Sequence, residues 1–300
     1  MAPSLTSSRL RRAGTALVAV LSLASTALVA APAEASQARH HGHRYLATGD
    51  SVPFAYRPPA VTPAGAYLDA STFRGYPGKA AHRLGLRLSN SSCPGETTAS
   101  FIDATAQSNG CENSLGSPAG YRDSFPLHVA YAGSQLDYDV AFLRKHRSTR
   151  LVTLNIGAND LFLCQRTNAD TCTGADFVAL TARIERNVGT ILSTLRDRGG
   201  YHHRLVVVSY YSLDYSDAAT TNGISALNAA LGRAARANDA GVADGFGAFR
   251  EAAESSGGDA CAAGLIIALP AGGCDVHPTK AGHRVLAHAV ARAAGLRHWH

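Results

Sequence analysis

Three short segments that lie far apart in the chain contain side chains suited to hydrolytic chemistry. Their sequences are Gly49-Asp50-Ser51, Gly157-Ala158-Asn159-Asp160 and Asp275-Val276-His277-Pro278. The first offers a hydroxyl nucleophile, the second a side-chain amide that can donate to a developing oxyanion, and the third an imidazole base with a carboxylate nearby. In combination they predict a serine ester hydrolase that forms an acyl-enzyme.

Each segment alone also has a purely structural explanation. Gly-Asp-Ser is a common turn sequence, and Asn159 and Asp160 can satisfy backbone groups in a loop after a strand. A single histidine carries little information in a chain that contains 13 of them. The functional interpretation therefore depends on the three segments meeting in space.

The sequence lacks the motifs of several competing enzyme classes. It contains no G-x-S-x-G nucleophile elbow, no H-E-x-x-H zinc helix and no Walker-type phosphate loop. Cys164 and Cys172 lack the C-x-x-C or paired-histidine spacing of a zinc site. A small histidine cluster at residues 40–43 fits a solvated N-terminal segment better than a metal site. We therefore expect neither a metal nor an organic cofactor.

Residues 1–35 have the order of a secretory signal peptide. Three arginines precede an apolar run, and the small-residue triplet Ala33-Glu34-Ala35 follows it. We expect cleavage before Ser36, a secreted, extracellular protein, and a single domain over residues 36–300. An uncleaved anchor is the alternative, because the run approaches spanning length, and no later segment is both long and apolar enough to span a membrane.

All six cysteines lie after this leader, in the part of the chain that folds in an oxidising compartment. The even number favours disulfides, although sequence alone leaves their connectivity open. We expect sequential pairing, because each pair then closes a short loop near one of the three segments. The expected pairs are Cys93 with Cys111, Cys164 with Cys172, and Cys261 with Cys274.

The charge of the chain argues against a nucleic-acid partner. The formal net charge is +6, and it falls to +4 without the leader, which carries three Arg and one Glu. The remaining positive charge is mostly arginine and is scattered along the sequence rather than clustered.

Strands and helices alternate along the sequence. Apolar and β-branched runs predict strands at 44–48, 86–90, 151–156, 205–211 and 241–246. Helical periodicity predicts helices at 78–86, 135–146, 176–198, 224–237 and 281–296. The proline-rich stretch 53–78 is expected to be a loop with little regular structure.

This alternation predicts an α/β fold, specifically a three-layer α/β/α sandwich with a central parallel sheet of about five strands. Ser51 and Asn159 each follow a predicted strand, so both are expected at the carboxyl edge of the sheet. His277 is expected in a loop at the entrance to the last helix, with Pro278 in the first helical turn.

The order of these motifs resembles the SGNH hydrolases, also called GDSL lipases and esterases. Gly-Asp-Ser stands near the mature N-terminus, Gly-x-Asn-Asp in the middle and His-Pro-x-x-x-Gly near the C-terminus, and residues 90–98 are similar to the family's glycine block. The resemblance spans about residues 45–295. With the leader and six cysteines, the chain is similar to secreted lipases of actinobacteria.

The resemblance implies a role for each matched residue. Ser51 attacks the ester carbonyl, and His277 takes its proton. The oxyanion is held by the backbone N–H groups of Ser51 and Gly95 and by the side-chain amide of Asn159. The family acid commonly lies three residues before the histidine, where this chain has Cys274, whereas Asp275 lies only two residues before it. Either the Asp275 carboxylate or the Cys274 carbonyl then orients the imidazole.

The expected activity is hydrolysis of lipid-like acyl esters, and the protein is expected to be a monomer. Such substrates can be presented at a lipid interface. A carbohydrate acetyl esterase of the same fold is an alternative enzyme. A noncatalytic protein that binds lipid or cell wall is a third hypothesis, disfavoured because every reactive position is filled.

Overall fold

The computed structural model describes residues 42–295. The leader expected at residues 1–35 lies outside the described residues. Within them, five parallel strands form one sheet in the order β2-β1-β3-β4-β5. The strands are β1 (Arg44–Gly49), β2 (Arg87–Asn90), β3 (Thr149–Asn155), β4 (Arg204–Val208) and β5 (Gly241–Ala243). The predicted parallel sheet of about five strands is confirmed.

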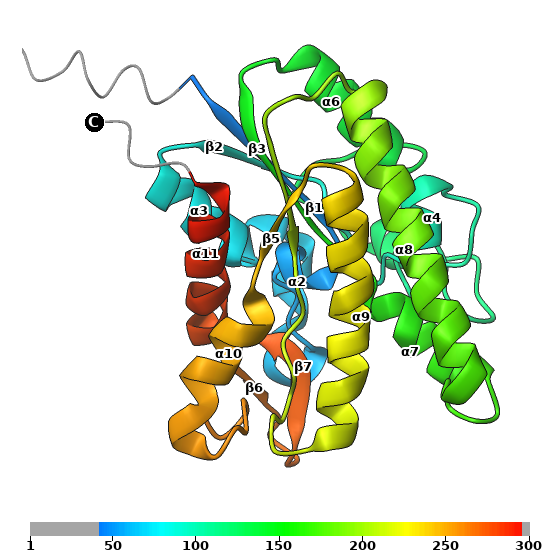
Figure 1. The fold of residues 1–300 in the computed structure, drawn as a ribbon, viewed down its shortest axis with the longest axis vertical. Helices are drawn as coiled ribbons and strands as arrows, with labels where there is room; N and C mark the ends of the chain where they lie inside the picture. Colours follow the sequence, from blue (N-terminus) through cyan, green and yellow to red (C-terminus); the bar gives the residue numbers. More distant parts are fainter. Residues whose placement is uncertain (1–41, 296–300) are drawn as a thin grey trace, which may run out of the picture.

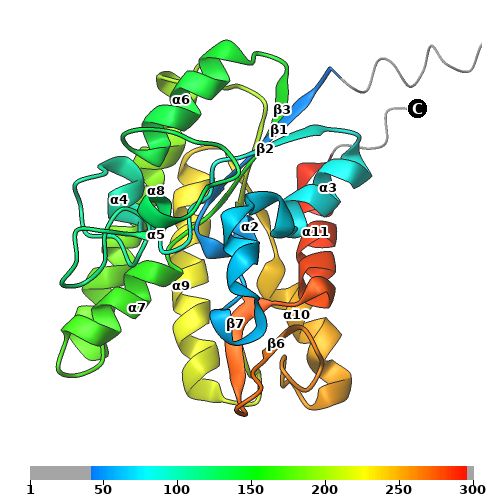
Figure 2. The same ribbon diagram turned by 180° about the vertical axis from the view of Figure 1, so that it is seen from behind.

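Helices cover both faces of this sheet, which gives the predicted three layers (Figures 1 and 2). One layer contains α3 (Tyr76–Leu84) and α11 (Lys280–Ala294), with α10 (Gly245–Ala253) packed against α11. The other contains α6 (Gln135–Lys145), α8 (Gly174–Asp197) and α9 (Ala218–Ala237). The sheet is therefore shielded on both sides, as its apolar central strands require.

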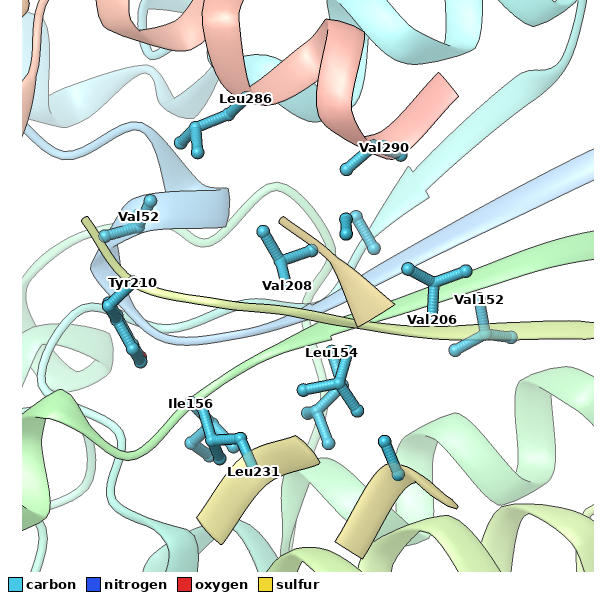
Figure 3. Close-up of a cluster of buried hydrophobic side chains, with 14 of the residues drawn as sticks. Val52, Val152, Leu154, Ile156, Val206, Val208, Tyr210, Leu231, Leu286 and Val290 are labelled. Atoms are coloured by element: carbon cyan, nitrogen blue, oxygen red, sulfur yellow. The ribbon is translucent and has the colours of Figure 1, made fainter. Parts of the chain in front are cut away.

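The core lies between the sheet and these two layers. Figure 3 shows Leu286 and Val290 of α11 facing the sheet from one side and Leu231 of α9 from the other. Val208 of β4 and Leu154 of β3 are fully buried between them. Because the middle strands contact helices on both faces, they read in sequence as continuous apolar runs rather than as alternating ones.

Side chains cap the helices that matter for the site. The Asp217 carboxylate accepts a hydrogen bond at the start of α9, so this helix begins six residues earlier than its apolar periodicity predicts. Thr279 caps α11 by accepting from the backbone N–H groups of Ala281 and Gly282. The first turn of α11 is therefore fixed by a threonine rather than by Pro278.

The stretch 53–78 differs from the predicted loop, because much of it is short helix and buried aromatic side chains. The helical turns are α2 (Ser51–Phe54), η1 (Pro59–Val61), η2 (Ala64–Leu68) and η3 (Ala70–Thr72). Phe54, Tyr67 and Phe73 form a second small core that is at most 5% exposed. The prolines prevent long helices but not the burial of the aromatic rings between them.

A two-stranded antiparallel hairpin near the C-terminus was not predicted. It pairs β6 (Ile266–Ala268) with β7 (Cys274–Pro278), so His277 and Pro278 lie in a strand and not in a helix entrance. The prediction for this segment is wrong because the strand is only five residues long and contains aspartate and proline, which are depleted in strands. The remaining elements are α4 (Thr98–Ile102), α5 (Tyr121–Ser124), α7 (Ala158–Thr167) and η4 (Glu254–Ser256).

Among residues 42–295, none of the helices has the length and apolarity needed to cross a membrane.

Candidate active site

Ser51 is placed by the close approach of β1 and β3. β1 ends at Gly49, whose φ is +125°, and a Cβ at this position would lie 2.0 Å from the carbonyl oxygen of Asn155 in β3. Only glycine tolerates both conditions. The chain then turns into α2, and the Ser51 hydroxyl oxygen lies 2.9 Å from Nε2 of His277.

Asp50 fixes the start of α2. One carboxylate oxygen accepts from the backbone N–H of Val52 at 2.9 Å, and the other accepts from the hydroxyl of Tyr210. Burial raises the pKa of Asp50 to about 6, although both hydrogen bonds act in the opposite direction. The residue before the serine is thus a buried cap that locks the turn.

His277 and Asp275 form a close pair. Nδ1 of His277 lies 2.5 Å from Oδ1 of Asp275, and the same oxygen accepts from the backbone N–H of His277 at 2.9 Å. Partial burial acts to raise the pKa of Asp275, but its hydrogen bond to His277 and the imidazole charge outweigh this and lower the pKa. The hydroxyl of Tyr211 donates to the Val276 carbonyl at 2.6 Å and holds β7 in place.

The strand conformation of β7 explains the unusual spacing of this pair. In a strand, residues i and i+2 project from the same face. Asp275 and His277 therefore meet directly, and the carboxylate rather than the Cys274 carbonyl is the hydrogen-bond partner of Nδ1 in the structure.

Asn159 lies in the first turn of α7, not in the loop considered from sequence. Its side-chain oxygen accepts from Nδ2 of Asn109 at 2.7 Å, and the backbone N–H of Asn109 donates to the Gly95 carbonyl at 2.8 Å. Because Asn109 occupies the oxygen, the amide nitrogen of Asn159 is the end left to donate. Asn109 thus links Asn159 and Gly95, which are the side-chain donor and one of the backbone donors predicted for the oxyanion.

Gly95 is tightly enclosed by the loop that carries Asn109. Its φ is +88°, and a Cβ here would lie 2.7–2.8 Å from backbone atoms of residues 109–111. Cys93 and Cys111 form a disulfide beside this contact and hold the two segments together. The hydroxyl of Ser108 accepts from the backbone N–H groups of Cys111 and Glu112, which orders the loop further.

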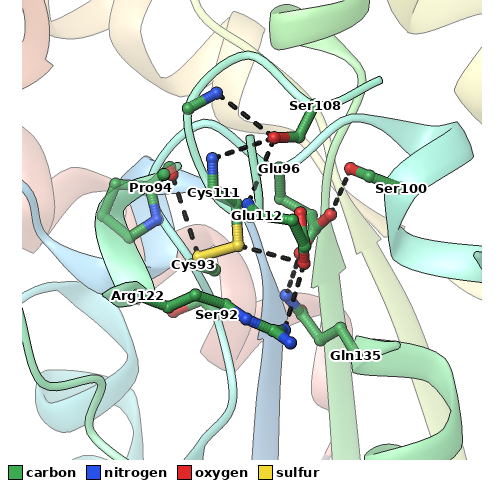
Figure 4. The surroundings of a disulfide bond; sticks show 12 residues. Ser92, Cys93, Pro94, Glu96, Ser100, Ser108, Cys111, Glu112, Arg122 and Gln135 are labelled. Carbon is green, nitrogen blue, oxygen red and sulfur yellow. Dashed lines mark hydrogen bonds and ion pairs between the residues drawn. A yellow bond between two sulfur atoms is a disulfide. The ribbon is translucent and has the colours of Figure 1, made fainter. Parts of the chain in front are cut away.

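A buried polar network connects this loop to the end of β1 (Figure 4). The side-chain oxygen of Gln135 accepts from the backbone N–H of Gly49 at 2.6 Å, and its nitrogen donates to Glu96 at 3.0 Å. Gln135 is fully buried and lies at the start of α6. The side-chain amide of Gln135 therefore bonds both Glu96, which follows Gly95, and Gly49, which lies two residues before Ser51. This shared partner couples the positions of the two backbone segments.

Two buried glutamates stand at the centre of Figure 4. Burial and the nearby charge of Glu112 raise the pKa of Glu96 well above its usual range. Arg122 lies 3.2 Å from Glu112 and favours the ionised form there. Of the two glutamates, Glu96 therefore favours the protonated form more strongly. One of its carboxyl oxygens also accepts a hydrogen bond from the Ser100 hydroxyl.

Asp160 ties the Asn159 turn to the segment after Gly95. Its two oxygens accept from the backbone N–H of Thr98 at 2.8 Å and from the Thr98 hydroxyl at 2.6 Å. Burial raises the pKa of Asp160 to about 6, opposed by these hydrogen bonds. The Gly-x-Asn-Asp motif thus combines a donor that faces the site with a carboxylate that braces it.

A cavity of about 580 Å³ opens beside Ser51, Asn159 and His277. Its walls come from α7, the loop after β4, and the N-terminal ends of α8 and α9. They are mainly apolar, with contributions from Leu161, Phe162, Phe177, Leu213 and Ile224. The volume is in the range of ordinary ligand pockets, which is roughly 300–1,000 Å³.

Each disulfide lies next to a part of this site. Cys93–Cys111 holds the Gly95 loop, Cys164–Cys172 closes the loop after α7 that borders the cavity, and Cys261–Cys274 anchors β7 one residue before Asp275. These are the sequential pairs expected from the sequence. Cys93, Glu96 and Cys111 are close enough to suggest a metal site, but the disulfide leaves no thiolate to bind a metal.

Sequence reasoning missed the residues that hold the site together. Asn109 and Gln135 have no motif of their own, and Tyr210 reads only as part of a strand. For Gln135, the sequence shows only a polar residue at the start of a predicted helix. This pattern is equally typical of a solvent-exposed helix end, so it does not indicate burial.

Known structures share this fold. LAE5, an α/β-hydrolase enzyme from the metagenome of Lake Arreo, is 16% identical with a TM-score of 0.54, over 85% of this chain and 96% of that chain. A catalytic mutant of Axe2, an acetylxylan esterase from Geobacillus stearothermophilus, is 14% identical with a TM-score of 0.54, over 86% and 96%. The lipase Lip_vut3 from a goat rumen metagenome is 17% identical with a TM-score of 0.52, over 85% and 98%.

Similarity at these identities shows the fold alone, and the sequence has no match among curated proteins. Residues 47–285, however, match the model of the GDSL-like lipase/acylhydrolase family, which confirms the resemblance seen in the motifs. The matched region includes all three segments and the Gly95 block. The chain therefore belongs to the GDSL-like lipase/acylhydrolase family of ester hydrolases.

Proposed function

We propose that this protein is a secreted serine hydrolase of lipid-like acyl esters. The observation that carries the proposal is the continuous contact from Ser51 Oγ to His277 Nε2 and from His277 Nδ1 to Asp275, at the mouth of an apolar cavity. The three disulfides and the signal-like leader support export.

The first half of the reaction acylates Ser51. Asp275 accepts a hydrogen bond from the Nδ1–H group of His277, which leaves Nε2 as the acceptor for the serine proton. As the proton moves to Nε2, Oγ bonds to the ester carbonyl carbon and the carbonyl oxygen becomes an oxyanion. His277 then gives the proton to the alcohol, which leaves as the carbon–oxygen ester bond breaks.

The oxyanion receives hydrogen bonds from three donors in this proposal. They are the backbone N–H groups of Ser51 and Gly95 and the side-chain amide of Asn159. Asn109, Gln135 and Asp160 hold these donors in position without touching the substrate. A preorganised donor set stabilises the transition state because it needs no rearrangement as charge develops.

The second half of the reaction is hydrolysis of the acyl-enzyme. His277 removes a proton from water, the hydroxide attacks the acyl carbon, and the proton returns to the Ser51 oxygen as the carboxylic acid leaves. The acyl chain lies in the apolar cavity during this step. An acetyl group would fill little of a 580 Å³ space, so the cavity favours longer acyl chains over acetylated carbohydrate.

The test is an ester panel with increasing acyl length, and acetylated sugars beside it, run on the wild type and on Ser51→Ala. We expect a preference for longer acyl chains and a loss of kcat of about 10⁶ in the variant. Most of the activity surviving in Ser51→Ala would refute the serine mechanism. A preference for acetylated sugars would refute the substrate class alone.

A fluorophosphonate probe separates the enzyme from a noncatalytic binding protein. The folded wild type with intact disulfides should be labelled at Ser51, and Ser51→Ala should not. Absence of labelling in a folded wild type would contradict catalysis altogether.

A further inference from the structure

A second cavity, of about 600 Å³, lies between α3 and α11 and is lined by cations. These helices lie side by side in Figures 1 and 2. Arg74, Lys79 and Arg83 reach the cavity from the segment before α3 and from α3 itself, and Arg284 reaches it from α11. Among residues 42–295, neither an aspartate nor a glutamate lines it.

These four cations lack carboxylate partners in the part of the chain that the structure describes. Within residues 42–295, the ion pairs involve other residues. Arg74 donates to the Ser71 carbonyl, and Arg83 lies 2.9 Å from the His288 ring nitrogen. Asp69 is near enough to Arg74 for the arginine charge to help lower the pKa of Asp69, but this carboxylate is exposed and already accepts hydrogen bonds from Ser71.

Histidines contribute polar side chains to the wall of the same cavity. His82, His128 and His288 are also in its lining. Burial and the charges of Arg83 and Arg292 lower the pKa of His288, as expected where several cations converge. Like charges four residues apart on a helix, such as Lys79 and Arg83, are unfavourable for helix stability. The cluster therefore works against folding unless an anion offsets it.

The lining also has an apolar part. Phe73, Pro77 and Leu88 contribute to the wall, and Leu88 is 37% exposed. Arginine side chains bind phosphate oxygens in a bidentate manner, and several cations arranged around one space suit an anion with more than two oxygens. A cavity with both features matches a phosphate group attached to an apolar molecule.

We propose that this cavity binds the phosphate ester of an amphiphile, as in an anionic phospholipid head group. It is separate from the catalytic cavity. Phe54, the last residue of α2, belongs to the small aromatic core with Tyr67 and Phe73. Phe73 also lines the cavity between α3 and α11. An amphiphile bound here would hold the protein against a lipid surface while Ser51 remains free to act.

The experiment compares Lys79→Gln/Arg83→Gln with a control of equal charge change, Arg186→Gln/Arg236→Gln. The control arginines are exposed on α8 and α9, which belong to the opposite layer. Binding is measured by cosedimentation with phosphatidylglycerol vesicles and with phosphatidylcholine vesicles, and by calorimetry with inorganic phosphate. Hydrolysis of a soluble short-chain ester and the unfolding midpoint are measured on every protein.

We expect the cavity variant to bind phosphatidylglycerol vesicles roughly 30-fold more weakly than the wild type, from the removal of two cations near an anionic surface. The control variant and Lys79→Arg/Arg83→Lys should bind within a few fold of the wild type. Hydrolysis of the soluble ester should be unchanged in all of them, which separates failure of this proposal from failure of the proposed function.

The other outcomes decide the proposal. Phosphate binding that is lost in the cavity variant would show that the cavity also takes the free anion, whereas binding to vesicles alone would assign it to the lipid head group. Equal weakening in the cavity and control variants would reduce the effect to net charge and overturn the proposal. Equal binding to phosphatidylcholine, or no binding by the wild type to either anion source, would also overturn it.

Discussion

The cavity beside Ser51 and the cavity between α3 and α11 have nearly the same volume, about 580 and 600 Å³, but opposite electrostatics. Beside Ser51, each buried acid has hydrogen-bond donors, as Asp50 has in Tyr210 and Val52. Between the two helices, cations converge, and none of them has a carboxylate partner among the residues that the structure describes. Compensated charge is what a preorganised reaction site requires, whereas uncompensated charge is unfavourable until a counterion binds.

His283 lies between the two regions and is affected by both. Its Nδ1 accepts from the backbone N–H of Tyr76 at 3.2 Å, at the start of α3. Burial lowers the pKa of His283 to about 3, and the charges of His277 on one side and Lys79 on the other act in the same direction. The contrast between the regions can therefore be tested at the two sites and at the residue between them.

Apart from the loss of Ser51 itself, the largest effect is expected when the carboxylate is removed from the catalytic pair. Asp275→Asn should lower kcat by about 10⁴-fold, because an amide favours the wrong imidazole tautomer. Hydrolysis of a soluble ester measures this, with Asp197→Asn on the exposed end of α8 as the control. A loss of only severalfold would show that the Cys274 carbonyl is sufficient to orient His277.

A smaller effect is expected at the oxyanion donors. Asn159→Ala should lower kcat by about 10²–10³ with little change in KM, because the donor acts on the transition state. Asn109→Ala should lower kcat less, since Asn109 only positions Asn159 and Gly95. If the Asn109 variant lost more activity than the Asn159 variant, the assignment of donor and support would be reversed.

The apolar wall of the catalytic cavity should control the acyl length. Ile224→Trp should reduce kcat/KM for a decanoate ester by about tenfold relative to an acetate ester, because the larger ring fills the space for the chain. Val242→Trp, at an exposed position on β5, serves as the control. An equal loss for both esters would mean that the chain binds elsewhere.

Acid should destabilise the protein through His283. Because its folded pKa of about 3 lies below the ordinary value, its stabilising contribution is present above about pH 6.5 and is lost as the pH falls. Between about pH 7.5 and 5.5 the loss is about 1.4 kcal/mol. His283→Gln should be less stable than the wild type at the higher pH but should lack this part of the pH dependence.

Chemical denaturation at the two pH values measures the effect. Asp50 and Asp160 have raised pKa values, and their contributions run in the opposite sense, since they are lost as the pH rises. The difference between variant and wild type isolates His283. An identical pH dependence in both proteins would show that His283 does not stay neutral in the fold.

The smallest effect is the change in stability expected when one charge is removed from the cavity between α3 and α11. Lys79→Gln should stabilise the protein by about 0.2–0.5 kcal/mol at low ionic strength, because it removes repulsion along α3. The gain should disappear at about 1 M salt, where exposed charges are screened. Loss of stability on this substitution would mean that Lys79 already has a partner in the folded protein.

Much of the fold could be predicted because its signals are local. The helical period of residues 176–198 and the apolar run at 205–211 each reflect burial against a large core, so α8 and β4 were found, although the strand ends three residues earlier than predicted. The carboxyl-edge rule then placed Ser51 and Asn159 together. Gly95 required the family resemblance, because a single glycine has no periodicity to interpret.

The rest could not be predicted because it depends on pairing between distant segments. β7 is a strand only because it pairs with β6 and is anchored through Cys274, and this pairing turns the short Asp275–His277 spacing into a contact. Asn109 and Gln135 acquire their roles from neighbours in other motifs. Nothing in their own segments indicates those neighbours.

The sequence by itself determined the layered α/β framework, the serine and histidine, and membership of the family, because periodicity and motif order are properties of neighbouring residues. Only the tertiary structure decided which group contacts His277 and how the oxyanion donors are braced. It also brought Arg284 to Lys79 and Arg83 from the other end of the chain. Hydrogen bonds act over about 3 Å and interactions between charges over about 10 Å, and only folding brings such distant residues within that range.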